Sequence, residues 1–256
     1  MYTAEIVFQF AHADVSEEAI EYAEHFLGTL RMNGQICGDA FPSTLNHTRY
    51  LAYALIPEQD ALNEARYNTY VQHWHTMLRD NGLLHVASTV LGEESGLGVC
   101  ECAKTDTYIL YMDFLSLESP LLCGTCFAPI PLYRLPPTIN EEYQDIISWQ
   151  SDYQACARLY LNDTTTQRSV LRELTQWDSA LSTQGIAICQ TITRLTTIPT
   201  YYYLFRHGGR SLKQERARRC PANGKEWLLD EPWHGVFDFR CDESRLLSNI
   251  GYYVRK

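Results

Sequence analysis

Gly98–Pro136 has the sequence GVCECAKTDTYILYMDFLSLESPLLCGTCFAPIPLYRLP and holds two close cysteine pairs. The cysteines are two positions apart in the first pair and three in the second, spacings at which a tight turn presents two thiolates to one metal ion. The TDTYILYMDFLSL segment between the pairs is rich in β-forming residues, so we expect β structure that brings both turns together. The stretch predicts a zinc ribbon with one structural zinc per chain. Its expected ligands are Cys100, Cys102, Cys123 and Cys126.

Two alternatives to zinc at these cysteines remain open. One is a set of four free thiols, and the other is a redox or iron–sulfur site. If zinc is bound, four thiolates leave no coordination position for a catalytic water, which argues against zinc hydrolase chemistry. The zinc is therefore expected to fix geometry rather than to react.

Residues 1–93 alternate between strand-like and helix-like patterns. Strands are expected at Tyr2–Phe10, Gln35–Asp39, Thr48–Ile56 and Leu84–Leu91. Ser16 predicts the cap of a first helix, and Pro57 is expected to open a second helix whose buried side is marked by Val71, Trp74 and Leu78. The order β-α-β-β-α-β predicts a ferredoxin-like module.

The C-terminal part holds a second ribbon-like stretch, Arg218–Asn249, with the sequence RRCPANGKEWLLDEPWHGVFDFRCDESRLLSN. Its two turns begin at Cys220 and Cys241, but Asn223 and Ser244 stand where the second thiolate of each pair belongs. Two thiols do not hold a four-coordinate zinc, and His234 is an unfavoured third ligand because it falls in the middle of the hairpin. We expect a degenerate ribbon that keeps its shape by hydrophobic packing.

The expected architecture is α+β and has four parts along the chain. They are a ferredoxin-like module at 1–93, a zinc ribbon at 94–137, a helical segment at 138–199 and a degenerate ribbon at 200–256. The Gly92–Gly98 segment, GEESGLG, is a linker by composition.

The 256-residue chain carries a formal net charge of −10, which is the wrong sign for a protein that coats nucleic acid. The charge is uneven, since residues 206–256 hold 11 Lys and Arg against 7 Asp and Glu. Arg206–Arg219 is the basic cluster, here called the basic segment. It is expected either to contact phosphates or, as we favour, to dock on the acidic body of the protein itself. Its candidate contact residues are Arg210, Lys213, Arg216, Arg218 and Arg219.

The chain has no apolar run of 18 residues, and its first ten residues lack the basic start of a signal peptide. We therefore expect a cytoplasmic protein without a membrane partner. In that reducing compartment, nine cysteines are more naturally metal ligands and free thiols than disulfides.

Two sets of motifs resemble a known bacterial family. LSLESPLLCGTC and PLYRLP in the middle, with RRCP, EW, FDFRCD and RLLSN near the C-terminus, resemble zinc-ribbon-containing proteins of unknown function that carry a nucleic-acid-binding label. The resemblance is consistent with the whole length of the chain. It implies a metal-bearing ribbon and a nucleic-acid partner, but the departure at Asn223 and Ser244 puts the second metal site in doubt.

The sequence contains no Ser-His-Asp signature, phosphate loop or dinucleotide fingerprint, so we expect no enzymatic activity. The expected function is binding of another protein, and an immunity protein that neutralises a bacterial toxin is its specific form. Acidic surfaces suit basic partners such as toxins or nucleic-acid-handling proteins, and the 17 tyrosines suit an interface. The alternatives are a nucleic-acid-associated zinc-ribbon protein and an enzyme with an unrecognised site.

Overall fold

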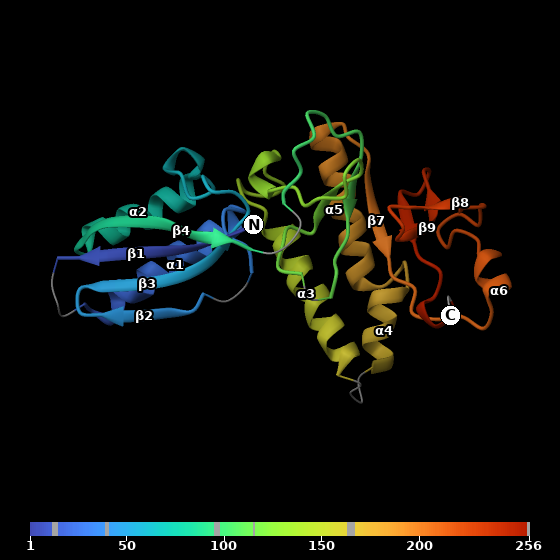
Figure 1. Ribbon diagram of the computed structural model, residues 1–256, viewed down its shortest axis with the longest axis horizontal. Coiled ribbons are helices and arrows are strands. Elements are labelled where there is room, and N and C mark those ends of the chain that lie inside the picture. The colour runs from blue at the N-terminus through green and yellow to red at the C-terminus, as the bar shows by residue number, and fades with distance from the viewer. Residues whose placement is uncertain (12–14, 39–40, 95–97, 115, 163–166, 255–256) are drawn as a thin grey trace. The chain divides into compact units, whose positions relative to one another are not determined.

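The computed structural model of the chain describes residues 1–11, 15–38, 41–94, 98–114, 116–162 and 167–254. Residues 95–97 of the predicted linker and Asp39 of a predicted strand lie outside these ranges. The chain forms two compact units, and Figure 1 shows the elements of each. Unit 1 comprises Met1–Glu101, Leu117–Ser119 and Ala128–Ile147, and unit 2 comprises Cys102–Ser116, Pro120–Phe127 and Ser148–Lys256.

Unit 1 contains a four-stranded antiparallel sheet with its strands in the order β2-β3-β1-β4. Its elements follow the chain as β1 (Tyr2–Phe10), α1 (Glu17–Met32), β2 (Ser43–Asn46), β3 (Arg49–Ile56), α2 (Thr69–Asp80) and β4 (Leu83–Glu93). This βαββαβ order with that strand order is the ferredoxin-like topology, so the prediction for this part of the chain is confirmed.

Local signals account for α1. The Ser16 hydroxyl accepts a hydrogen bond from the Ala19 N–H at 3.2 Å, which caps the helix, and Gly34 adopts a positive φ of 73° just after its end. The apolar residues of α1 recur every three or four positions and are buried. Phe26 on this face meets Phe8 of β1 edge to face, with ring centroids 5.9 Å apart.

Two details of the expected module are wrong. The second strand is Ser43–Asn46 rather than Gln35–Asp39, and Cys37 makes only an isolated bridge to Leu55. All four β2 side chains are exposed, so this strand has no burial pattern for the sequence to reveal. The second helix begins at Thr69 rather than after Pro57, because the Asn68 side chain accepts a hydrogen bond from the Val71 N–H at 2.9 Å and caps it there.

Unit 2 is built on a six-stranded sheet with its strands in the order β6-β5-β7-β10-β9-β8. The strands are β5 (Tyr108–Leu110), β6 (Leu121–Cys123), β7 (Thr200–Leu204), β8 (Leu228–Trp233), β9 (Phe237–Cys241) and β10 (Leu246–Ser248). The helices are most of α3 (Gln144–Leu161), α4 (Gln167–Thr175), α5 (Ala180–Thr196) and α6 (Leu212–Arg216). The α5 helix packs closely on β7 at Gly185, where an added Cβ would lie 2.3 Å from the Tyr202 ring.

The sheet of unit 2 departs from the expected separate ribbons at 94–137 and 200–256. Strand β5 pairs in parallel with β7, so strands from both stretches belong to one sheet. All three β5 residues are buried, as is usual for a strand covered on both faces, and β5 lies between β6, its antiparallel neighbour in sequence, and β7. Within the described ranges, none of the helices combines the length and the apolar character needed to cross a lipid bilayer.

Candidate metal centre

The four predicted ligand sulfurs lie together. The Sγ atoms of Cys100, Cys102, Cys123 and Cys126 are all within 4.8 Å of one another. A tetrahedral metal bound about 2.3 Å from each sulfur would place the sulfurs roughly 3.8 Å apart, so the set fits such an ion with little adjustment. Cys100 and Cys123 are buried, whereas Cys126 is exposed. These four cysteines can therefore hold a metal ion.

Two polar groups contact Cys123 of the second cysteine pair. The Thr125 N–H donates to the Cys123 sulfur at 3.4 Å, and the Thr105 hydroxyl lies at the same distance from it. Gly124 fits closely in this turn, because an added Cβ would lie 1.8 Å from the Thr107 hydroxyl oxygen. Donors of this kind stabilise thiolate rather than thiol, which is the form that binds a metal.

The first pair is held through its backbone. The Cys100 N–H donates to the Pro129 carbonyl at 2.8 Å, and the Arg134 guanidinium donates to the Cys100 carbonyl at 2.6 Å. Arg134 also forms an ion pair with Glu58 at 2.5 Å. Burial alone opposes ionisation of Glu58, but hydrogen bonds from Arg134 and Tyr133 hold its pKa below the ordinary value. The carboxylate thus keeps Arg134 oriented toward the first cysteine turn.

His234 contacts the second cysteine turn, which the sequence did not reveal. Its Nε2 atom lies 2.9 Å from the Gly124 carbonyl oxygen. The imidazole is stacked on Phe127 and on Trp233, with ring centroids 4.8 and 5.1 Å away. The structure therefore places His234 beside the candidate metal centre and not among the positions of the degenerate ribbon. The two contacting residues are 110 positions apart, so spacing gives no signal for the contact.

The structure also brings together the four positions of the degenerate ribbon. The Cys220 sulfur lies 3.2 Å from the Ser244 hydroxyl oxygen, and the Asn223 amide donates to the Cys241 sulfur at 3.4 Å. Each polar residue that replaces a thiolate is thus hydrogen-bonded to a cysteine of the opposite turn. Trp227 and Phe239 pack beside them with ring centroids 5.1 Å apart. Hydrogen bonds and aromatic packing hold the two turns together.

The five cations predicted to contact nucleic acid separate into two groups. Arg218 forms an ion pair with Glu215 at 3.1 Å, and Arg219 forms one with Glu226 at 2.7 Å. The remaining three are exposed, and none has an ion pair among the residues that the structure describes: Arg210, Lys213 and Arg216. The two paired cations thus meet carboxylates within or shortly after the basic segment, and among the described residues no ion pair joins the segment to the acidic body at 1–205.

Glu215 is the carboxylate that pairs with two arginines of the basic segment, Arg206 and Arg218. Its side chain is 2% exposed, and it also binds Arg206 at 2.7 Å and the Gly251 N–H at 3.2 Å. Burial opposes ionisation, but the bonds from Arg206 and the charge of Arg218 hold the pKa of Glu215 below its ordinary value. A lowered folded-state pKa stabilises the protein at neutral pH, and this stabilisation is lost as the pH falls through that pKa.

Glu215→Gln is expected to lower the free energy of unfolding at pH 7 by about 1.5–3 kcal/mol, because charged hydrogen bonds are lost in a buried place. Urea unfolding at pH 7 and near pH 4 measures the effect, and the gap between wild type and variant should narrow in acid. Glu226→Gln is the matched control, since this exposed pair should contribute less than about 1 kcal/mol. Equal losses in the two variants would contradict the assigned role of Glu215.

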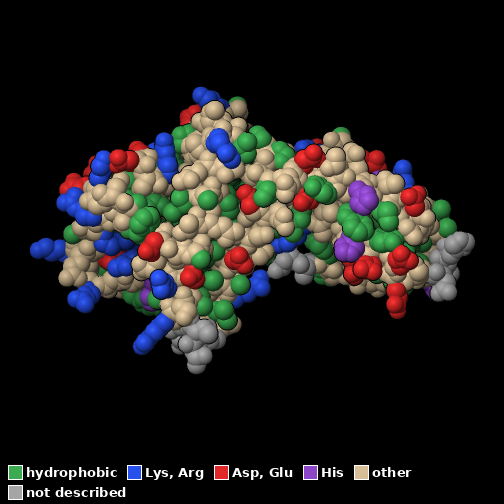
Figure 2. Space-filling view, turned by 180° about the vertical axis from the view of Figure 1, so that it is seen from behind, with side chains coloured by type: hydrophobic (Ala, Val, Ile, Leu, Met, Phe, Trp, Pro, Cys, Tyr) green, Lys and Arg blue, Asp and Glu red, His purple; other side chains and the backbone are tan. Residues whose placement is uncertain are grey.

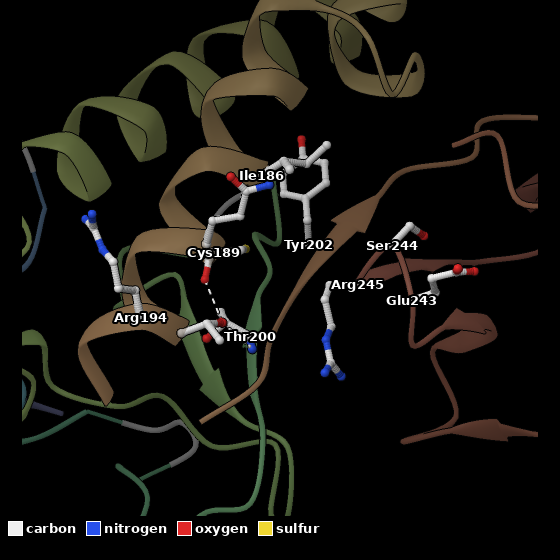
Figure 3. Close-up of a pocket in the computed structure, with 10 residues that line it drawn as sticks. Ile186, Cys189, Arg194, Thr200, Tyr202, Glu243, Ser244 and Arg245 are labelled. Carbon is white, nitrogen blue, oxygen red and sulfur yellow. Dashed lines mark hydrogen bonds between the residues drawn. The ribbon is translucent and has the colours of Figure 1, made fainter. Parts of the chain in front are cut away.

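A cavity of about 410 Å³ lies between α5, β7 and the turn at 243–245. Figure 3 shows Arg194 and Arg245 on opposite sides of it, with Thr200 between them. Ser244, which also contacts Cys220, is part of the wall. The cavity and the degenerate ribbon therefore share this turn, but the two cations do not converge on one point.

Unit 1 carries an exposed cluster on α1 and α2, here called the aromatic–acidic surface. Half-buried Trp74 of α2 stacks on His25 of α1, with ring centroids 4.5 Å apart, and it also lies near Tyr22, at 5.9 Å. His73 is 5.5 Å from the same indole. Two exposed glutamates of α1 contact these aromatic residues: Glu18 accepts a hydrogen bond from Tyr22, and Glu21 lies 3.6 Å from His25. Two further exposed glutamates, Glu17 and Glu24, belong to the same helix.

The charges of the chain divide between the units. Unit 1 has 5 Lys and Arg against 18 Asp and Glu, whereas unit 2 has 16 against 13. In Figure 2, Lys and Arg side chains gather over unit 2, and Asp and Glu lie around histidine and apolar side chains on unit 1. The acidic character of the protein is thus a property of unit 1.

Three families match successive parts of the chain, and each is described only as a domain of unknown function. Their matched residues are 1–92 for DUF8589, 102–205 for DUF2310 and 209–254 for DUF8594. Among solved structures, Rv0793 from Mycobacterium tuberculosis is 15% identical over 38% of this chain and all of that chain, with a TM-score of 0.30. An antibiotic biosynthesis monooxygenase is 11% identical over 36% of this chain and 98% of that chain, with a TM-score of 0.27. Likenesses this low carry no argument about function.

Two curated relatives from Haemophilus influenzae are each named only as an uncharacterized protein. One is 41% identical over 56% of this chain and 71% of the relative. The other is 33% identical over 98% of this chain and 99% of the relative. None of these families or relatives is described as a zinc ribbon. This chain belongs to the same family as the second relative, the uncharacterized Haemophilus influenzae protein that it matches along almost its entire length.

Proposed function

We propose that this chain is a non-enzymatic, zinc-stabilised cytoplasmic protein that binds a basic protein partner. The observation that carries the proposal is the aromatic–acidic surface of unit 1, where a half-buried tryptophan stacks on a histidine and two glutamates contact the neighbouring rings. Interfaces concentrate their binding energy in aromatic residues of this kind, while surrounding charges select the partner.

The proposed metal is one structural zinc per chain, bound by the four clustered cysteines. Four thiolates in a tetrahedral set are a common structural zinc site, and they leave no open position for a reacting water. The thiolate-stabilising contacts of Cys123 support this assignment. The zinc would hold the turns after Gly98 and β6 in place, and the proposal assigns it no catalytic step.

The aromatic–acidic surface has the composition of a binding surface. The Trp74 ring is held between the two helices by His25 and Tyr22, so it loses little conformational freedom on binding. The Tyr22 hydroxyl donates to Glu18 at 2.6 Å and His25 lies 3.6 Å from Glu21, which orders both aromatic rings. This surface is therefore organised before a partner arrives.

Charge complementarity defines the partner. Unit 1 carries a net charge of −13 by its Lys, Arg, Asp and Glu content, so it would attract a basic protein over a distance of about one Debye length, roughly 8–10 Å at cellular salt. A bacterial toxin that acts on nucleic acid is a basic protein of this class. The narrower form of the proposal is accordingly an immunity protein that covers such a toxin.

The experiment is affinity capture of the tagged full-length protein from nuclease-treated extract of its native host. We expect a basic protein in stoichiometric amount at about 0.1 M salt and its release at about 0.5 M, because screening weakens exposed charge pairs. Recovery of a protein that poisons cells when expressed alone would establish the immunity form. Recovery of no basic protein in stoichiometric amount would overturn the proposal.

A nucleic-acid-associated protein is the second candidate, and a specific observation favours it. Arg210, Lys213 and Arg216 are exposed and have no ion pair among the described residues, so they are available for phosphates. Retention of the full-length protein on DNA or RNA at about 0.1 M salt, lost in the triple alanine variant, would support this candidate. Equal retention of wild type and variant would remove it.

His234→Ala is expected to speed the release of zinc to a chelator about tenfold, because loss of an outer hydrogen bond loosens a metal ligand turn. His234→Gln keeps an N–H donor and should restore most of the slow release. The matched control is His73→Ala, an exposed histidine of unit 1. Identical release rates for wild type and His234→Ala would show that His234 does not support the metal turn.

A further inference from the structure

The degenerate ribbon retains two thiols on opposite turns, Cys220 and Cys241, which are hydrogen-bonded to each other. We propose that Cys220 and Cys241 form a thiol–disulfide exchange site that reacts with small-molecule disulfides of the glutathione type. The product is an intrachain disulfide that joins the two turns of the degenerate ribbon, as a metal would join them in an intact ribbon. The inference concerns unit 2 and is independent of the proposed partner surface.

The surroundings of Cys241 favour its thiolate. The Asn223 amide donates to its sulfur at 3.4 Å, and the side chain and backbone of Ser244 and the Cys220 thiol also form hydrogen bonds with it. Burial works against ionisation, but these donors together hold the pKa of Cys241 below its ordinary value. The thiolate is the nucleophile in disulfide exchange, so Cys241 is the attacking residue.

Cys220 is placed to resolve the reaction. It is 1% exposed, its sulfur is hydrogen-bonded to Cys241, and it lies 3.2 Å from the Ser244 hydroxyl. Its turn is closed by the Gly224 N–H, which donates to the Cys220 carbonyl at 2.8 Å. Cys220 is less accessible than Cys241, which is 5% exposed and precedes the exposed residues Asp242 and Glu243.

The two turns are also fixed relative to each other. Lys225 of the first turn forms an ion pair with Glu243 of the second at 2.6 Å, and Asn223 donates to the same carboxylate at 3.0 Å. These contacts hold the two cysteines side by side in the reduced protein. A dithiol held in this way closes to a disulfide with little loss of chain freedom.

The reaction balances with the disulfide as the named oxidant. The Cys241 thiolate attacks one sulfur of oxidised glutathione, whose S–S bond breaks and releases one glutathione thiolate. The Cys220 sulfur then attacks the Cys241 sulfur, the mixed S–S bond breaks, and the Cys220 proton leaves with the second glutathione as its thiol. Two protein thiols are oxidised to one disulfide, and one small-molecule disulfide is reduced to two thiols.

The other cysteines outside the candidate metal centre lack these features. Burial raises the pKa values of Cys156 and Cys189, and it raises the pKa of Cys37 to about 12. A raised thiol pKa lowers the thiolate fraction and slows attack on a disulfide. Cys156 is half-buried, so it provides an internal reference for reactivity.

The test treats zinc-loaded full-length protein with oxidised glutathione, traps free thiols by alkylation and maps peptides by mass spectrometry. We expect a Cys220–Cys241 disulfide to form at least about tenfold faster than any modification of Cys156, because the reacting thiolate fraction differs. Cys220→Ser should stop at a glutathione mixed disulfide on Cys241, and Cys241→Ser should form neither product.

A control variant and the wild-type result keep the test decisive. Cys156→Ser should form the Cys220–Cys241 disulfide at the wild-type rate. If Cys241 in the wild-type protein is no more reactive than Cys156, the proposal is overturned without recourse to any variant. It is equally overturned if the mixed disulfide in Cys220→Ser forms elsewhere than at Cys241.

Discussion

Cys123→Ser is expected to remove zinc from the protein and to unfold the turns that the four cysteines form. Cys123 is 0% exposed, ends β6, accepts a hydrogen bond from the Thr125 N–H and lies within hydrogen-bond distance of the Thr105 hydroxyl. Loss of a ligand should weaken zinc binding by more than the roughly 100-fold that loss of an outer hydrogen-bond partner costs. Zinc content by atomic emission and thermal unfolding measure the two effects.

Zinc stabilises the folded protein because it binds the folded state and not the unfolded one. A site that is filled at 1,000 times its dissociation constant stabilises the folded state by about 4 kcal/mol, and this stabilisation disappears with the metal. Chelation of the wild-type protein should therefore reproduce the Cys123→Ser effect. Cys156→Ser, a half-buried cysteine outside all the sites, is the matched control and should keep its zinc. Full zinc content in Cys123→Ser would contradict the four-thiolate site.

Trp74→Ala is expected to weaken binding of the captured basic partner by about 30-fold or more, the loss of about 2 kcal/mol that marks an interface hot spot. The indole is half-buried and packs against the edge of the core of unit 1, so its removal should cost some stability, whereas the fully buried residues that form this core remain in place. Titration calorimetry with the partner and circular dichroism of the variant measure both expectations.

The control for this variant is Trp177→Ala. Trp177 lies in unit 2 and is 38% exposed, so Trp177→Ala makes the same chemical change as Trp74→Ala but outside the aromatic–acidic surface. Glu17→Gln combined with Glu21→Gln should slow association and reduce its dependence on salt, because surface charges act mainly on the encounter. Unchanged affinity in Trp74→Ala would show that the partner binds elsewhere.

Much of unit 1 was predictable because its signals are local. The Ser16 cap and the apolar spacing of α1 depend only on residues close together in the sequence, and β1 was expected at its observed bounds. Strand β2 escaped prediction because its exposed side chains have no pattern. The start of α2 was predicted at Pro57, a common first residue of helices, whereas the Asn68 cap sets the observed start at Thr69.

Unit 2 was harder because its organisation is not local. The parallel pairing of β5 with β7 joins a three-residue strand to a five-residue strand about 90 positions away, and such short strands carry little register information. The cysteine cluster was predictable because each pair lies within one turn. The contact of His234 with the Gly124 carbonyl was not predictable, because it comes from a hairpin 110 positions away in the sequence.

The aromatic–acidic surface shows how a correct periodicity can mislead. Trp74 was expected on the buried side of its helix together with Val71 and Leu78, both of which are 0% exposed. The indole does pack against the core of unit 1, but it is only half-buried and also stacks on His25 at the edge of that side. The spacing of Glu17, Glu21 and Glu24 at four and three residues on α1 was the available signal that an acidic face lies beside it.

The most direct measurement is the zinc content of the full-length protein purified without added metal or chelator. The account predicts one zinc per chain, retained in Cys220→Ser and lost in Cys123→Ser. Two zinc ions per chain would contradict the degenerate ribbon, and a chain without zinc would contradict the four-thiolate centre.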